Sequence, residues 1–165
     1  MVKRRCVFLD RDGVINVKAA PGEYISQWSE FRFLSGIVNW IRLFKALDFL
    51  VIVVTNQRGV ARGSIRPTDL EEIHRRMCEE LERAGAPVDG VLCCPHEEGA
   101  CGCRKPLPGL VFNAERQWNI DLRSSLVIGD SDTDRQLAAN CEMAFVLVHD
   151  ERIVDVIHRP GAQNL

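Results

Sequence analysis

Cys6-Val7-Phe8-Leu9-Asp10-Arg11-Asp12-Gly13 is a short apolar run that stops abruptly at two aspartates. Four apolar residues are too few for a helix, so the run predicts a strand over residues 6–9. Residues 49–54 are almost entirely apolar and β-branched, which predicts a second strand buried on both faces. Polar side chains follow each strand immediately. We therefore expect the functional residues of this chain at the strand ends.

Helical and strand-like segments alternate along the rest of the chain. Apolar residues at helical spacing predict helices over residues 37–47 and 110–118. Thr68 and Glu71 form a capping-box pattern that predicts the start of another helix, ending at Gly85. Further strands are expected over residues 88–93, 125–128 and 144–148, and a further helix over residues 133–140, whereas the tail after Asp150 is weakly patterned.

This alternation predicts one α/β domain over residues 1–165, with a central parallel sheet between layers of helices. In such sheets, ligands bind beyond the carboxyl ends of the strands. Four predicted strands end at Asp10, Thr55, Cys94 and Asp130, so these side chains are expected to meet in one crevice.

Composition narrows the class of protein. The chain has 46% hydrophobic and 27% charged residues and a formal net charge of -2, as expected for a soluble globular domain. No apolar run approaches the length of a membrane span, and the one after residues 1–5 is too short for a signal peptide. The seven cysteines suit a reducing compartment. We therefore expect a cytoplasmic monomer without nucleic-acid or membrane partners.

Four potential metal ligands crowd a single loop. Cys94, His96, Cys101 and Cys103 match the Cys₃His set of a closed tetrahedral zinc site. With all four positions filled by protein, no site remains for a catalytic water, so zinc is expected to staple the loop structurally. Cys93 competes with Cys94 for the first position, although Cys93 continues the apolar strand. The simpler alternative is a set of free thiols on a flexible loop.

Three aspartates at strand ends suggest a second metal. Asp10 and Asp12 lie two residues apart, and Asp130 follows another strand. Clustered carboxylates repel one another and usually accompany a cation, and hard oxygen ligands suit Mg²⁺. One aspartate could then attack phosphorus while another transfers protons. The alternative is that Asp10 and Asp12 merely form a turn.

Hydrogen-bond donors and positive charges surround this acidic centre in the sequence. Thr55 and Asn56 place a hydroxyl and an amide at a strand end, where both could bind a phosphoryl oxygen. Arg104 and Lys105 directly follow the cysteine loop and offer a bidentate fork and a point charge to an anion. Turn chemistry and a solvated charge pair are the corresponding simpler interpretations.

Together these segments resemble the four motifs of the haloacid dehalogenase (HAD) superfamily of phosphotransferases. The motifs are Phe8-Leu9-Asp10-Arg11-Asp12-Gly13-Val14, Thr55-Asn56-Gln57, Arg104-Lys105-Pro106 and Gly129-Asp130-Ser131-Asp132-Thr133-Asp134. The resemblance spans about residues 5–150. It implies a Rossmann-like three-layer fold without a large cap domain. The zinc loop and the loops at residues 18–24 and 58–64 must then shape the pocket.

The resemblance also implies a role for each acidic residue. Asp10 becomes the nucleophile that forms an aspartyl phosphate. Asp12 is the general acid and base, and it also binds Mg²⁺ through its backbone carbonyl. Asp130 completes the magnesium site, and Asp134 orients Lys105.

The remaining motif residues are implied to hold the substrate. Thr55 and Lys105 steady the phosphoryl group, and Arg104 helps to recognise the substrate. Asn56 and Ser131 are the other expected substrate contacts, although some relatives carry lysine at the position of Ser131.

The zinc loop narrows the resemblance to a subgroup that contains heptose 1,7-bisphosphate 7-phosphatases and histidinol-phosphatase domains. Residues 31–36, 56–63 and 105–109 look more like the heptose enzymes, whereas the short spacer between His96 and Cys101 is nearer the histidinol-phosphatase pattern. We expect removal of the 7-phosphate of D-glycero-D-manno-heptose 1,7-bisphosphate, with histidinol phosphate, an amino-alcohol phosphate, as the alternative substrate. The residues also leave open a phosphotransferase or mutase, and a non-catalytic zinc-stabilised binding module.

Overall fold

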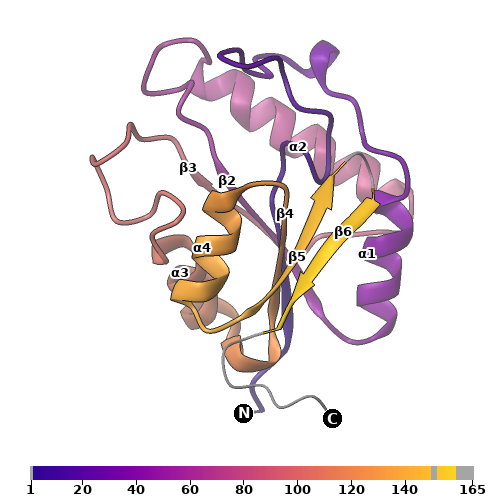
Figure 1. Cartoon of the computed structure of the whole chain (residues 1–165). Helices are drawn as coiled ribbons and strands as arrows, with labels where there is room; N and C mark the ends of the chain where they lie inside the picture. The colour runs from indigo at the N-terminus through magenta and orange to yellow at the C-terminus, as the bar shows by residue number, and fades with distance from the viewer. Residues whose placement is uncertain (1, 150–151, 159–165) are drawn as a thin grey trace.

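The computed structural model describes residues 2–149 and 152–158. Within these residues the centre is a six-stranded sheet in the order β3-β2-β1-β4-β5-β6 (Figure 1). Its strands are β1 (Cys6–Leu9), β2 (Leu50–Asn56), β3 (Gly90–Cys94), β4 (Leu126–Gly129), β5 (Ala144–His149) and β6 (Arg152–Ile157). Strands β1 to β5 are parallel, and β6 pairs antiparallel with β5.

Helices cover both faces of the sheet. Helices α1 (Ile37–Ala46) and α2 (Pro67–Arg83) pack on one face, and α3 (Gly109–Trp118) and α4 (Asp132–Asn140) pack on the other (Figure 1). Two short 3₁₀ helices, η1 (Trp28–Glu30) and η2 (Leu122–Ser124), lie in the connections. The prediction of a three-layer α/β fold is confirmed.

Strands β1 and β2 contribute to the core on both faces of the sheet because successive side chains point to opposite faces. Val7 and Leu9 join the apolar cluster beneath α1 and α2, whereas Cys6 and Phe8 join the cluster beneath α3 and α4. All four are completely buried. Double-sided burial explains the continuous apolar runs in the sequence and fixes the strands that carry Asp10 and Thr55.

The start of α2 differs from the capping-box prediction, which is wrong. The helix begins at Pro67, and its N-cap is Arg66, whose side chain makes no capping hydrogen bond. Proline is suited to the first helical position because its φ angle is preset and it has no N–H to leave unpaired. Asp69 in the first turn instead pairs with the Arg66 guanidinium, with Nε–Oδ2 at 2.6 Å. Thr68 is therefore already inside the helix.

The sheet also extends beyond the last predicted strand. Residues 152–157, in the tail that looked weakly patterned, form β6 at the edge of the sheet. Only two residues separate β5 from β6, and a parallel connection needs a dozen or more. The added strand runs antiparallel at the edge of the predicted central parallel sheet, so the sheet as a whole is mostly parallel.

The parallel strands bring their carboxyl ends to one edge of the sheet. Asp10 follows β1, Thr55 and Asn56 end β2, Cys94 ends β3 and Asp130 follows β4. Among the residues that the structure describes, no helix combines the length and apolar character needed to span a membrane.

Candidate active site

Lys105 forms the centre of a buried ionic cluster. Its ammonium donates to Asp10 Oδ1 at 2.8 Å, to Asp134 Oδ1 at 2.6 Å and to the Val54 carbonyl at 2.9 Å. The side chain is only 3% exposed. Burial alone would lower the pKa of Lys105, but the charges of Asp10 and Asp134 outweigh it and raise the pKa. The residue is therefore a fixed positive charge with all three N–H groups in use.

Asp10 is held in one orientation at the end of β1. Its Oδ1 accepts from Lys105 and also from the Arg11 backbone N–H at 2.8 Å. Two donors on Oδ1 leave Oδ2 as the oxygen available to a substrate. Burial, and then the charge of Asp134, raise the pKa of Asp10 to about 7 in spite of Lys105.

Asp130 approaches this cluster from β4. Its Oδ2 lies 2.5 Å from Lys18 Nζ, whereas its Oδ1 is buried without a hydrogen-bond partner. Burial raises the pKa of Asp130 as well. The approach requires glycine at position 13, where φ is +95° and a Cβ would lie 2.0 Å from Asp130 Oδ2.

The acidic cluster has the donor set of a divalent-cation site. Oxygens of Asp10, Asp130 and Asp134 lie within 4.8 Å of one another. Asp134 already accepts from Lys105 and, through Oδ2, from the Ser131 hydroxyl at 2.6 Å. The buried Oδ1 of Asp130 has no hydrogen-bond partner, and Mg²⁺, which prefers carboxylate oxygens, would supply one.

Asp12 lies in a separate cradle of donors. Arg11 donates to both carboxylate oxygens from Nη2, at 2.9 and 3.0 Å. Asn16 Nδ2 donates to Oδ1 at 2.9 Å and Gln57 Nε2 donates to Oδ2 at 2.8 Å. Burial would raise the pKa of Asp12, but the charge of Arg11 and these hydrogen bonds outweigh it and lower the pKa. Asp12 is therefore a carboxylate in the substrate-free protein.

The cradle itself was not predicted from the sequence. Arg11 is completely buried, and its Nη1 donates to His74 Nε2 on α2 at 3.2 Å. Burial, and then the charge of Arg11, lower the pKa of His74 to about 4, which keeps its imidazole neutral as an acceptor at pH 7. The position of Arg11 between two motif aspartates was the one sequence feature that could have indicated its role in binding Asp12. No sequence feature indicates the contact with His74.

Thr55 and Asn56 fix their neighbours at the end of β2. The buried Thr55 hydroxyl accepts from Gln57 Nε2 at 2.9 Å. The Asn56 side chain accepts from the Lys105 backbone N–H and donates to its carbonyl, both at 3.0 Å. Asn56 thus ties the chain around Lys105 to the strand, and its contact with a substrate stays a prediction.

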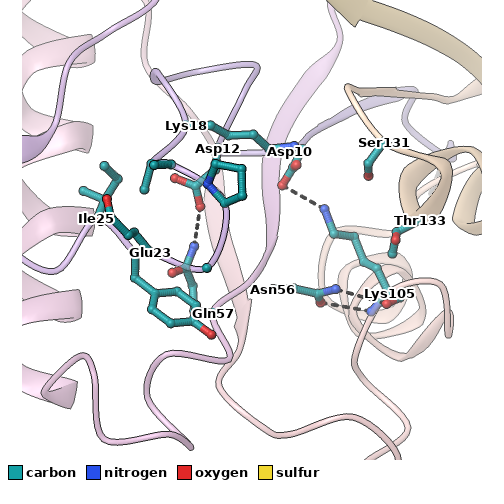
Figure 2. A pocket seen from close by; sticks show the side chains of 15 residues that line it. Asp10, Asp12, Lys18, Glu23, Ile25, Asn56, Gln57, Lys105, Ser131 and Thr133 are labelled. Carbon is teal, nitrogen blue, oxygen red and sulfur yellow. Dashed lines mark hydrogen bonds and ion pairs between the residues drawn. The ribbon is translucent and has the colours of Figure 1, made fainter.

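A cavity of about 300 Å³ opens over these residues (Figure 2). Its lining consists of residues 18–25 and of strand-end and loop residues, namely Asp10, Asp12, Asn56, Gln57, Lys105, Ser131 and Thr133. Of the three loops expected to shape the pocket, the one at residues 18–24 lines it, whereas the cysteine loop lines a neighbouring cavity. The loop at residues 58–64 instead pairs with the cysteine loop, with Arg62 Nε 2.9 Å from Glu97 Oε2.

Arg104 lies beside this cavity rather than in its lining. It lines a neighbouring cavity of about 420 Å³, and both cavities share Lys105 and Thr133. Its Nη1 is buried without a hydrogen-bond partner. An unpaired guanidinium donor of this kind is suited to an anion bound in the neighbouring cavity that Arg104 lines.

The cysteine loop brings its four predicted ligands together. Cys94 Sγ lies 3.5 Å from Cys101 Sγ and 3.6 Å from His96 Nδ1, and Cys103 Sγ lies 3.3 and 3.4 Å from the same two atoms. A tetrahedral zinc ion with ordinary bond lengths spaces such ligands about 3.6–3.8 Å apart. Cys93 points away because neighbouring strand residues face opposite sides, and it is only partly buried. The residues present therefore fit zinc.

Comparisons with known proteins agree with this geometry. The HAD-hydrolase-like family model matches residues 102–153. The chain is 35% identical over 152 residues to the D-glycero-alpha-D-manno-heptose-1,7-bisphosphate 7-phosphatase of Campylobacter jejuni, covering 92% of this chain and 86% of that protein. It is 40% identical over 144 residues to the corresponding beta-heptose enzyme of Rhodopseudomonas palustris, covering 82% and 78%.

A solved structure shows the same similarity in three dimensions. The D,D-heptose 1,7-bisphosphate phosphatase of B. bronchiseptica, complexed with magnesium and phosphate, superposes with a TM-score of 0.81 at 35% identity, covering 89% of this chain and 83% of that one. Both curated relatives and the solved structure therefore match most of the chain. The chain thus belongs to the HAD superfamily, within the group of heptose 1,7-bisphosphate 7-phosphatases.

Proposed function

We propose that this protein is a Mg²⁺-dependent phosphomonoester hydrolase that removes the 7-phosphate of D-glycero-D-manno-heptose 1,7-bisphosphate. The observation that carries the proposal is the buried Asp10–Lys105–Asp134 cluster beside the partnerless Oδ1 of Asp130. One carboxylate is oriented for attack, and a cation site lies next to it. The names of relatives at 35–40% identity supply the substrate.

The first half of the reaction uses the orientation of Asp10. Oδ2 attacks phosphorus, the bond from phosphorus to the substrate oxygen breaks, and an aspartyl phosphate remains on Asp10. Lys105 keeps Oδ1 in place and places a positive charge beside the phosphoryl group. We assign the buried Thr55 hydroxyl to steadying the phosphoryl group, together with Lys105.

Asp12 transfers protons in both halves of the reaction, the formation and the hydrolysis of the aspartyl phosphate. The departing substrate oxygen takes a proton from Asp12, and the resulting carboxylate then removes a proton from the water that hydrolyses the aspartyl phosphate. Against burial, the charge of Arg11 and the hydrogen bonds from Arg11, Asn16 and Gln57 lower the pKa of Asp12 and so favour its carboxylate form, which is the form that accepts a proton from water in the second half of the reaction. The anionic phosphate of an arriving substrate repels that carboxylate and raises its pKa, which prepares the first half.

Asp10 and Asp130, together with the Asp12 backbone carbonyl, are the residues that would hold Mg²⁺. When bound, the ion neutralises charge on the phosphoryl oxygens and on the carboxylates. Cys94, His96, Cys101 and Cys103 would hold a structural zinc that fixes the chain leading to Arg104 and Lys105.

The cavity is small, and polar side chains form part of its lining. We assign Arg104, Ser131 and Asn56 to substrate recognition, with Asn56 acting partly through the backbone of Lys105. The one-domain chain and its free cysteines suit a monomer in the reducing cytoplasm, acting on a small phosphorylated sugar.

A direct comparison of substrates tests the proposal. We expect Mg²⁺-dependent phosphate release from heptose 1,7-bisphosphate, assayed in both anomers, with a kcat/KM at least about 100-fold above that for histidinol phosphate. A higher kcat/KM for histidinol phosphate would reassign the substrate. The absence of phosphate release from every ester, with both metals bound, would favour a non-catalytic module.

A further inference from the structure

Lys18 lines the cavity and forms an ion pair with Asp130. It comes from the loop at residues 18–25 and extends toward the side of the cavity that holds Asp10 (Figure 2). Its ammonium lies 2.5 Å from Asp130 Oδ2, and Asp130 is its one polar partner among the described residues. The Lys18 side chain is 50% exposed, whereas the Asp130 side chain is 10% exposed. A half-exposed cation on a loop is therefore paired with a nearly buried acid.

The two ammonium groups that line the cavity differ in what they can still bind. Lys105 uses its three N–H groups on Asp10, Asp134 and the Val54 carbonyl. Lys18 has one partner and solvent around the rest of its ammonium. Of these two, only Lys18 can turn toward a new anion without breaking a buried network.

We propose that Lys18 is an exchangeable counter-ion, which holds Asp130 while no divalent cation is bound and holds a phosphate oxygen of the substrate once the cation takes Asp130. The inference rests on the proposed function for the identity of the phosphorylated substrate. It assigns Lys18 as a residue that couples metal binding to anion binding.

Charge competition supports the first half of the exchange. A cation bound by Asp10 and Asp130 draws on the carboxylate charge that the Lys18 ammonium now neutralises. Two positive charges on one carboxylate repel each other, and the exposed lysine is the one free to move. Lys18 therefore opposes the cation when no anion is present.

Charge balance supports the second half. A phosphate ester brings about two negative charges into a cavity already lined by Asp10, Asp12 and Glu23. The displaced Lys18 is the exposed ammonium in that lining, so it can pair with the arriving phosphate. Because coupling is reciprocal, an anion that attracts Lys18 away from Asp130 also strengthens cation binding.

The test measures Mn²⁺ binding by electron paramagnetic resonance, with Mn²⁺ as the probe for the cation site and inorganic phosphate as the anion. Without phosphate, Lys18→Met should bind Mn²⁺ about five-fold more tightly than the wild type, the effect of losing one partly exposed ion pair. Added phosphate should tighten Mn²⁺ binding in the wild type by about five-fold more than in Lys18→Met. Lys18→Arg should behave as the wild type.

Lys3→Met is the matched control, because Lys3 is also exposed and forms an ion pair with Glu115, at 3.7 Å, away from the cavity. It should leave Mn²⁺ binding unchanged. Equal Mn²⁺ affinity in Lys18→Met and the wild type, or equal tightening by phosphate, would overturn the inference. Failure of heptose bisphosphate hydrolysis with the predicted Mn²⁺ behaviour intact would refute the proposed substrate alone.

Discussion

The ammonium of Lys105 lies between the carboxylates of Asp10 and Asp134, at 2.8 Å from one and 2.6 Å from the other. All three side chains are nearly or completely buried. Two acids and one base meet in a region where burial leaves little water to screen their charges. The arrangement is stable only while the central charge remains, and it orients the carboxylate that we assign as the nucleophile.

Replacing Lys105 by methionine should therefore damage both stability and activity. Two buried carboxylates lose their counter-ion, and removing one partner of a buried pair costs about 3–5 kcal/mol of unfolding free energy. We expect kcat to fall by at least about 10²-fold, because a fixed charge beside the phosphoryl group is lost. Urea unfolding and steady-state kinetics measure the two effects.

Lys45→Met is the control for that variant. Lys45 pairs with Asp89 at 2.8 Å, but both side chains are partly exposed. We expect a loss of about 1 kcal/mol or less and unchanged kcat. Equal destabilisation by the two substitutions would contradict the importance of the buried cluster.

Gly13→Ala should disable the cation site. The added Cβ would lie 2.0 Å from Asp130 Oδ2, so the carboxylate must move. Gly63→Ala places alanine at a similarly positive φ, +70°, with nothing within 4 Å of the new Cβ. Both variants carry backbone strain of about 1 kcal/mol, but Gly13→Ala alone should weaken Mn²⁺ binding, by about ten-fold or more. Similar Mn²⁺ affinities would show that Asp130 is not a ligand.

Zinc removal should loosen the loop that carries Arg104. The purified protein should hold one equivalent of zinc, and Cys101→Ser should reduce its zinc affinity by at least about 100-fold. We expect KM to rise by about ten-fold while Mn²⁺ binding changes little, because the two sites are separate. Cys78→Ser, which removes a thiol from α2 outside the cluster, should retain the metal. Metal-free wild-type protein with full activity would refute the structural role.

His74 should make stability depend on pH. Its folded-state pKa of about 4 lies below its usual value of 6.5, so only the unfolded chain binds a proton between these values. Stability is therefore complete above about pH 6.5 and falls as the pH decreases toward 4, by about 2 kcal/mol at pH 5. His74→Gln keeps an acceptor for Arg11 without the titration. Urea unfolding at pH 7.5 and pH 5 should show a smaller loss in the variant; an equal loss would exclude His74 as its source.

The sequence predicted what local patterns control. Apolar runs marked β1 and β2, and the acids at their ends marked the edge where the site forms. Cys94, His96, Cys101 and Cys103 were predictable because ligand type and spacing are local properties. The start of α2 was mispredicted because two helix-start signals compete: Pro67 places the N-cap at Arg66, whereas the Thr68–Glu71 pattern places it two residues later.

The sequence predicted that Asp134 would orient Lys105, but it did not predict several other long-range partners. Arg11 reaches His74 across 63 positions, and Lys105 reaches Asp10 across 95. Neither pair has a spacing rule, because only the packing of α2 and of the cysteine loop against the sheet brings the groups together. The same holds for Lys18 and Asp130, and for the edge strand β6, whose direction follows from a short connection rather than from its composition.

The most direct test of the central claim is acid quenching of the enzyme during turnover of heptose 1,7-bisphosphate with Mg²⁺, followed by mass spectrometry of its peptides. We expect one phosphate per chain, on Asp10, and a loss of turnover of at least about 10³-fold in a folded Asp10→Asn variant. Phosphate on another residue, or near-wild-type turnover by Asp10→Asn, would contradict the assignment of Asp10 as the nucleophile.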